Sequence, residues 1–312
     1  MRQLFIVALL GVATALPAQD DLLSLLGEEE EDLVVLTDAS FKTTRVINSH
    51  SLENVAHGVL DFKIGHRFGF LNEGFNEFFG LDQATIRLGL DYGVTPELMV
   101  GIGRSSYQKT VDGFVKYKLL RQCDQGCNMP ITLAGVAAMS MNTQEEEDLP
   151  WYDPTVENYF SHRLAYSFQL IAGRKFSESF TLQLMPGLVH KNLVPDSTYA
   201  HDILNMGVAG RIKLTKRVAI NAEYFYVPPD MLEEGYYNSF SIGFDIETGG
   251  HVFQLHATNS TGMFERAYIT ETVGQWSEGD IHFGFNISRV FTLHDPKAKA
   301  RERIREQEQG EG

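Results

Sequence analysis

The chain contains a series of short segments in which apolar and polar residues alternate. The connections between these segments are alternately short and long. The short connections are 93–98, 173–180, 213–218 and 246–252, and the long ones are 69–82, 142–162, 191–202, 227–238 and 259–279. A sheet that meanders through a membrane has tight turns on one side and longer loops on the other. A soluble sandwich has no reason to sort its loops in this way. The pattern therefore favours an all-β chain that crosses a membrane.

The segments between these connections alternate with a period of two residues. In 60–68 the apolar residues Leu60, Phe62 and Ile64 are interleaved with Asp61 and Lys63. Each such segment has one apolar and one polar face and is about ten residues long, which suits a tilted membrane strand. We expect the apolar faces to contact lipid and the polar faces to line the interior. A soluble barrel or sandwich with its apolar faces inward is the alternative.

The number of these segments predicts the topology. Strands are expected near 58–68, 83–93, 97–107, 110–121, 129–141, 162–173, 179–190, 202–213, 217–227, 237–247, 251–259 and 279–291. Twelve is an even number, as a single antiparallel up-and-down transmembrane barrel requires. Both termini then lie on the side of the short turns, which we expect to be the periplasm.

Three registers stay open at this stage. Arg104 falls on the same strand face as the apolar residues in 97–107. Either the register shifts there or Arg104 lies outside the membrane zone. Segment 129–141 is apolar on both parities. At Pro186, which has no N–H to donate, we expect a bulge or bend.

The two ends of the chain flank the strand series with different chemistry. Residues 1–18 have the positive and apolar regions of a signal peptide. Residues 19–56 are an acidic spacer whose later part, 33–56, is the candidate plug of the barrel. The barrel itself is predicted over 57–291, and 292–312 form a charged periplasmic tail. Export by a signal peptide places the protein in the cell outer membrane, and a net charge of −15 argues against nucleic-acid partners.

Several stretches carry a family resemblance. They are FKTTRVINSHSLENV (41–55), EFFGLDQATIRLGLDYG (77–93), MVGIGRSSYQKTVDGFVKYKLL (99–120), FDIETGGHVFQLHATNS (244–260) and GDIHFGFNISRVF (279–291). Over roughly residues 40–291 the chain resembles a bacterial outer-membrane β-barrel family named domain of unknown function 5777. The resemblance implies a barrel in the outer membrane of a Gram-negative bacterium. It implies no activity and no catalytic residues.

Function must therefore be sought in the charges on the polar faces. The candidate lumen residues are Asp61, Lys63, Arg67, Arg87, Asp91, Lys116, Lys118, Arg163, Arg211, Glu223 and Asp245. They form either a selectivity filter or a paired network that braces the wall or holds a plug, because a twelve-stranded barrel is narrow enough for one inserted segment to close. We expect a porin-like channel or transport barrel for small solutes. A closed structural or docking barrel, whose loops and tail bind periplasmic or surface proteins, is the alternative.

Other chemistry has weaker support in the sequence. Cys123 and Cys127 are expected to form a local disulfide in an oxidising compartment. The histidines lack metal-binding spacing, so no metal or cofactor is expected.

An outer-membrane lipid hydrolase built on His256, Asn259 and Ser260 is a minor alternative. No nucleophile motif supports it, and we expect no enzymatic activity. The expected partners are outer-membrane lipid, a small-molecule permeant and a protein partner.

Overall fold

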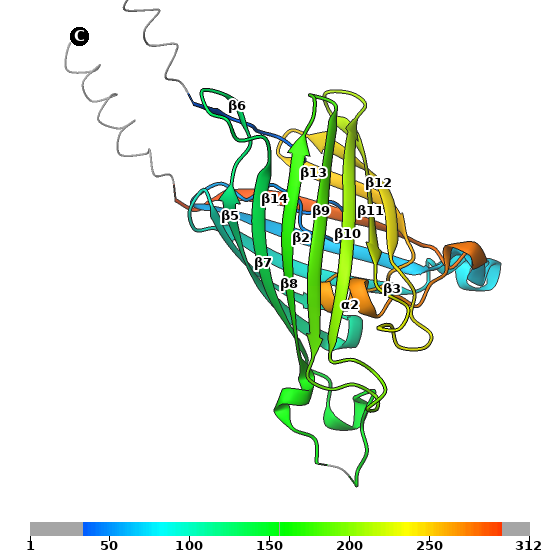
Figure 1. Ribbon diagram of the computed structural model, residues 1–312. Coiled ribbons are helices and arrows are strands. Elements are labelled where there is room, and N and C mark those ends of the chain that lie inside the picture. Colours follow the sequence, from blue (N-terminus) through cyan, green and yellow to red (C-terminus); the bar gives the residue numbers. More distant parts are fainter. Residues whose placement is uncertain (1–33, 156, 295–312) are drawn as a thin grey trace, which may run out of the picture.

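The computed structural model describes residues 34–155 and 157–294, which build a closed antiparallel barrel (Figure 1). Its twelve strands are β2 (Val59–Phe70), β3 (Ala84–Gly93), β4 (Leu98–Ser105), β5 (Thr110–Leu120), β7 (Thr132–Asn142), β8 (Leu164–Lys175), β9 (Phe180–Lys191), β10 (Asp202–Lys213), β11 (Val218–Tyr226), β12 (Phe240–Thr248), β13 (His251–Thr258) and β14 (His282–Thr292). Each pairs with the next barrel strand along the chain, and β14 pairs with β2 to close the barrel. The predicted all-β, twelve-stranded up-and-down barrel is confirmed.

The remaining elements are short and are not strands of the barrel wall. Strand β1 (Val35–Leu36) pairs with β6 (Cys123–Gln125) beyond the end of the barrel. Helix α2 (Glu265–Thr270) lies between β13 and β14. The 3-10 turns are η1 (Leu71–Glu73), η2 (Phe75–Gly80), η3 (Tyr107–Lys109), η4 (Glu146–Asp148), η5 (Phe160–Arg163) and η6 (Trp276–Glu278). No helix within 34–155 and 157–294 is long and apolar enough to cross a membrane.

The wall has the predicted two faces. In β3 the outward Leu88 is 47% exposed while the inward Asp91 is fully buried, and in β12 the outward Phe244 is 47% exposed while Asp245 is buried. Alternation puts successive side chains on opposite faces of a strand, so the apolar set lies outside and the polar set inside. An exposed apolar belt of this kind suits lipid, and a polar interior needs partners or water.

The three open registers are now resolved. The β9 register is the same on both sides of Pro186, so the expected bulge is wrong; the pairing of β8 with β9 is instead interrupted opposite Pro186, which has no N–H to donate. Strand β7 buries its even-numbered residues, from Thr132 to Asn142. Arg104 keeps an unshifted register at the long-loop end of β4, where it donates to the Lys109 carbonyl and the Thr143 hydroxyl.

The two ends of the barrel differ. Short turns join the strands at one end, where β2 begins and β14 ends, and the β1–β6 pair extends from that end (Figure 1). The longer loops, including 143–163, lie at the opposite end. The arrangement agrees with the expected sorting of turns except at two connections: 121–131 is long but lies at the short-turn end, and 106–109 is short but lies at the long-loop end. The assignment of the short-turn end to the periplasm stays a prediction. The signal peptide lies outside the described residues, as does most of the charged tail.

Candidate functional site

Residues 37–56, here called the inner segment, lie inside the barrel. The segment begins where Thr37 N donates to Gln122 O at 2.9 Å, and it ends beside His57, whose ring nitrogen is 2.6 Å from Val94 O. Gln122 and Val94 both follow the short-turn ends of strands, so the segment enters and leaves the lumen at the same end. Val46 and His50, near its middle, are fully buried.

The middle of the inner segment is a tight turn. Val46 N donates to Ser49 O at 2.8 Å, Ser51 N donates to Thr44 O at 2.9 Å, and Arg45 pairs with His50 across the turn. Asn and Ser favour turns because their short polar side chains bond to nearby backbone. We call residues 44–51 the tip.

Glu223 of β11 holds the tip from the wall. Its carboxylate accepts hydrogen bonds from Asn48 N at 2.8 Å, Ser49 N at 3.1 Å and Ser49 Oγ at 2.6 Å. Glu223 is 2% exposed. Hydrogen bonds to an ionised acceptor are roughly twice as strong as neutral ones, so Glu223 is a strong wall contact of the turn.

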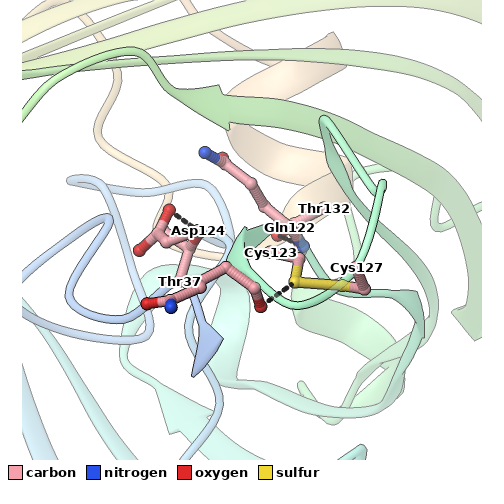
Figure 2. The surroundings of a disulfide bond; sticks show 7 residues. Thr37, Gln122, Cys123, Asp124, Cys127 and Thr132 are labelled. Carbon is pink, nitrogen blue, oxygen red and sulfur yellow. Dashed lines mark hydrogen bonds between the residues drawn. A yellow bond between two sulfur atoms is a disulfide. The ribbon is translucent and has the colours of Figure 1, made fainter. Parts of the chain in front are cut away.

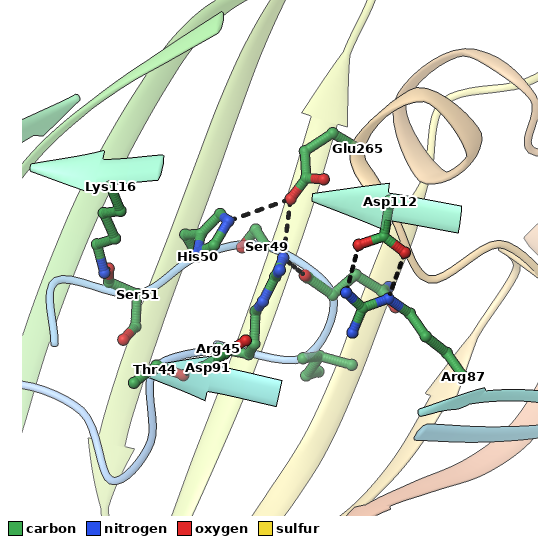
Figure 3. Close-up of polar contacts among 12 residues, drawn as sticks. Thr44, Arg45, Ser49, His50, Ser51, Arg87, Asp91, Asp112, Lys116 and Glu265 are labelled. Atoms are coloured by element: carbon green, nitrogen blue, oxygen red, sulfur yellow. Dashed lines mark hydrogen bonds and ion pairs between the residues drawn. The ribbon is translucent and has the colours of Figure 1, made fainter. Parts of the chain in front are cut away.

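Other inward side chains also bind the inner segment. Lys116, which lies beside Ser51 in Figure 3, donates from Nζ to Ser51 O and to Glu53 O, each at 2.6 Å. Further contacts are Lys63 to Thr43, Arg67 to Asn48, Thr44 to Asp91, Gln183 to His50 O, Arg211 to Ala39 O and Ser40 O, Gln254 to Val46 O, and Asn286 to Ile47 O. The polar face of the wall therefore binds both side chains and backbone carbonyls of a segment that has little regular structure of its own.

A second insert meets the tip from the long-loop end. Phe264, Tyr268 and Ile269, at and within α2, are fully buried in the lumen. Glu265 Oε1 accepts from Arg45 Nη1 at 2.8 Å and lies 3.3 Å from His50 Nε2 (Figure 3). The tip and α2 are thus joined by a buried ion pair, and together they occupy the middle of the lumen.

Most of the predicted lumen charges are inward and buried. They are Asp61, Lys63, Arg67, Arg87, Asp91, Lys116, Arg211, Glu223 and Asp245. Lys118 lies near the short-turn end, 3.9 Å from Glu53. Arg163 is not among them. It ends η5 in the long loop and donates to Gln144 O at 2.6 Å, because the chain leaves the strand conformation there and the two-residue alternation no longer applies.

Several partners of these charges were not identified from the sequence. Arg87 Nε donates to Asp112 Oδ1 at 2.9 Å and a second N–H donates to the other oxygen (Figure 3). Asp112 shares the parity of Lys116 on the same strand, so the two-residue period would have found it. Glu265 had no such signal, because it lies in a loop whose contacts are all distant in sequence.

The weaker expectations can also be located. His256, Asn259 and Ser260 are buried rather than exposed on the outer wall, so they cannot meet a lipid there. Within 34–155 and 157–294 no group of His, Cys, Asp and Glu is arranged to hold a metal ion. These placements favour neither hydrolysis nor metal chemistry.

A disulfide joins Cys123 and Cys127 in the connection after β5 (Figure 2). This connection contains β6, the partner of β1, and Thr37 Oγ1 donates to Asp124 Oδ1 beside it. The covalent link shortens the loop on which the start of the inner segment rests. The disulfide therefore lies where the inner segment enters the lumen.

Solved porin structures resemble the fold. The NanC porin is 8% identical, with 75% of this chain and 98% of that chain covered and a TM-score of 0.46. The KdgM porin is 7% identical, with 76% and 99% covered and a TM-score of 0.43. A mutant porin of Rhodopseudomonas blastica is 13% identical, with 66% and 55% covered and a TM-score of 0.30.

No curated protein sequence matches this chain. The family model of the membrane-bound β-barrel domain named domain of unknown function 5777 matches residues 41–291, which include eleven complete barrel strands and nearly all of β14. The resemblance noted in the sequence is thereby confirmed, and the chain belongs to this family of membrane-bound β-barrels.

Proposed function

We propose that this protein is an outer-membrane channel-type barrel for small solutes, whose lumen is closed at rest by the inner segment. One observation carries the proposal: buried charges of the wall are bonded to the main chain of a segment that enters and leaves the lumen at one end. Such a segment can withdraw from the barrel without threading the chain through it. A cavity of about 40 Å³ between the tip and β2 and β14 has room for water, but not for a solute.

The chemistry of the closure supports a removable plug. Glu223 and Lys116 have no ion-pair partner within the described residues, and their bonds run to the backbone of the inner segment. Burying an unpaired charge away from water is costly, whereas a wall charge in a water-filled lumen is readily solvated. When the inner segment leaves, these charges would therefore face water and act on permeating ions.

The location follows from the same reasoning. A closed barrel with an apolar belt has no free sheet edge and suits the lipid of an outer membrane. Export would depend on residues 1–18, which lie outside the described part of the chain. We propose no enzymatic activity, cofactor or nucleic-acid partner.

A closed docking barrel is the second candidate, and apolar packing favours it. Phe41, Val46, Leu52 and Val55 of the inner segment are all buried in one cluster with wall residues such as Phe114. Burial of such side chains contributes about 1.5–3 kcal/mol each, which opposes withdrawal. In that case the loops, or the tail beyond the described residues, would bind a protein partner.

Conductance of the refolded mature protein in planar bilayers separates the two candidates. We expect the full-length protein to conduct rarely and a variant lacking residues 19–56 to give stable conductance steps. In the open variant, Lys116→Gln should lower anion preference, because it removes a positive charge from the wall. Equal and constant conductance from both proteins would contradict closure by the inner segment. Silence from both, with folded barrels shown by circular dichroism, would favour the docking barrel.

A further inference from the structure

A cavity of about 560 Å³ opens among the long loops. It lies between loops 143–163, 192–201 and 227–239 and the α2 region, and we call it the outer vestibule. Its volume falls in the range of sites for small organic ligands. It is separate from the tip and its wall contacts, since the residues that line the two cavities do not overlap.

The inner side of the outer vestibule carries four charges of alternating sign. Lys191 Nζ lies 2.7 Å from Glu233 Oε1 and 3.6 Å from Glu271 Oε1. Arg266 Nη1 lies 3.0 Å from the same Glu271 oxygen. A site with both signs at short distance matches a ligand that itself carries both signs.

Two polar atoms of this group have no hydrogen-bond partner among residues 34–155 and 157–294. Glu271 Oε2 accepts no hydrogen bond and Arg266 Nε donates none, although both atoms are buried. Glu271 is 8% exposed. A buried carboxylate oxygen requires a donor and a guanidinium N–H requires an acceptor. A small rotation of the two side chains toward the cavity would let a ligand supply one of each.

The surroundings restrict the ligand further. The loops at the long-loop end carry 17 Asp and Glu against three Lys and Arg, which are Lys109, Arg163 and Arg266. This charge repels solutes of net negative charge. Leu193, Val194 and Trp151 also line the cavity and offer an apolar wall.

We propose that the outer vestibule binds a small organic zwitterion, such as an amino acid or short peptide. Its ammonium group would lie at Glu271 and Glu233, its carboxylate at Arg266, and its apolar body against Leu193 and Trp151. The inference deepens the proposed channel function and rests on it for its meaning, because the site lies at the outer mouth of the lumen. Binding itself requires no conduction.

Tryptophan fluorescence tests the proposal directly. The chain has two tryptophans. Trp151 lines the outer vestibule, whereas Trp276 donates to Phe240 O and lines a different hollow. In a Trp276→Phe background of the refolded full-length protein, Trp151 is the sole reporter. We expect trialanine to change its emission saturably, and equal concentrations of maltotriose, succinate and putrescine to leave it unchanged.

Variants connect the signal to the charged group. Glu271→Gln should weaken trialanine binding at least tenfold, while Glu278→Gln, which alters an exposed acid outside the cavity, should leave it unchanged. Glu233→Gln, which alters a less buried lining residue at the same ammonium position, should weaken binding too and serves if Glu271→Gln fails to fold. No saturable change with trialanine would overturn the proposal. So would equal binding of maltotriose, or unchanged binding in a folded Glu271→Gln or Glu233→Gln protein.

The outcomes also distinguish this inference from the proposed function. Trialanine binding in a protein that never conducts, even without residues 19–56, would uphold the site and overturn the channel. Conductance without trialanine binding would uphold the channel and overturn the zwitterion site.

Discussion

Glu223→Gln is the sharpest test of how the inner segment is held. The substitution keeps the shape of the side chain and removes its charge. In the native protein one carboxylate accepts from Asn48 N, Ser49 N and Ser49 Oγ. In the variant only one oxygen remains to accept, and the new amide nitrogen faces backbone donors.

The magnitude follows from these bonds. Hydrogen bonds to charged groups contribute about 1.5–3 kcal/mol and neutral ones about 0.5–1.5 kcal/mol, and a buried donor left without a partner costs about 1–3 kcal/mol. Losing the charge and leaving one N–H of the tip unpaired therefore costs about 2–4 kcal/mol for the inserted state. Each 1.4 kcal/mol is a tenfold change in population, so the tip should leave the wall about 30- to 700-fold more often.

Amide hydrogen exchange measures this population, because a protected amide exchanges when its segment opens locally. Peptides covering 42–56 should exchange faster by the factor above, while peptides from β7 and β8 stay protected. Glu77→Gln is the matched control, since Glu77 is exposed in η2, away from the lumen. Exchange of 42–56 within threefold of the native rate in a folded Glu223→Gln protein would refute the reasoning.

Three further changes test other parts of the structure. Arg87→Met leaves Asp112 buried without its partner and should lower the free energy of unfolding by about 3–5 kcal/mol in urea titrations. An added Asp112→Leu should recover most of this loss. A loss below about 1 kcal/mol in Arg87→Met alone would contradict a buried ion pair between Arg87 and Asp112. Replacing Cys123 and Cys127 by Ser should speed hydrogen exchange in β1 and leave the urea midpoint of the barrel unchanged, since the disulfide lies beyond the wall. A large fall in that midpoint would contradict a disulfide that stabilises only the β1–β6 region. Burial raises the pKa of Tyr236, in a loop outside the membrane-spanning strands, to about 12. Folding thus favours the neutral phenol of Tyr236. The stability that this contributes is present below pH 10 and is lost as the pH rises towards 12. Tyr236→Phe should therefore remove an absorbance step of tyrosine ionisation near pH 12 rather than near pH 10.

The barrel could be predicted from the sequence because its signal is local. The alternation of Leu88 with Asp91, or of Phe244 with Asp245, depends only on the two-residue period of a strand. The same rule explains why nine predicted charges point inward and why Arg163, just outside a strand, does not join them. Its position follows from η5, which the pattern did not predict.

The interior was less predictable because its contacts join distant parts of the chain. The location of 33–56 before the first strand suggested a plug, and the described inner segment does lie in the lumen. Nothing near Glu265 indicated that α2 would enter from the other end and meet Arg45, which is 220 residues away. The β1–β6 pair was missed for the same reason, since a strand of two residues has no periodicity to detect.

Helix α2 connects the tip, in the middle of the lumen, with the outer vestibule. Glu265 at its start binds Arg45 of the tip, and Glu271, directly after its last residue, binds Lys191 and Arg266 in the outer vestibule. A helix of six residues has no joint within it, so a movement that breaks one contact disturbs the other. A solute that binds the vestibule more tightly when α2 is displaced must therefore weaken the hold on the inner segment by the same factor, because coupling between two binding equilibria is reciprocal. The inner segment enters and leaves at the opposite end, so its release requires no movement of the wall. On the proposed function, a ligand in the outer vestibule would in this way change how firmly Glu265 holds the tip at Arg45.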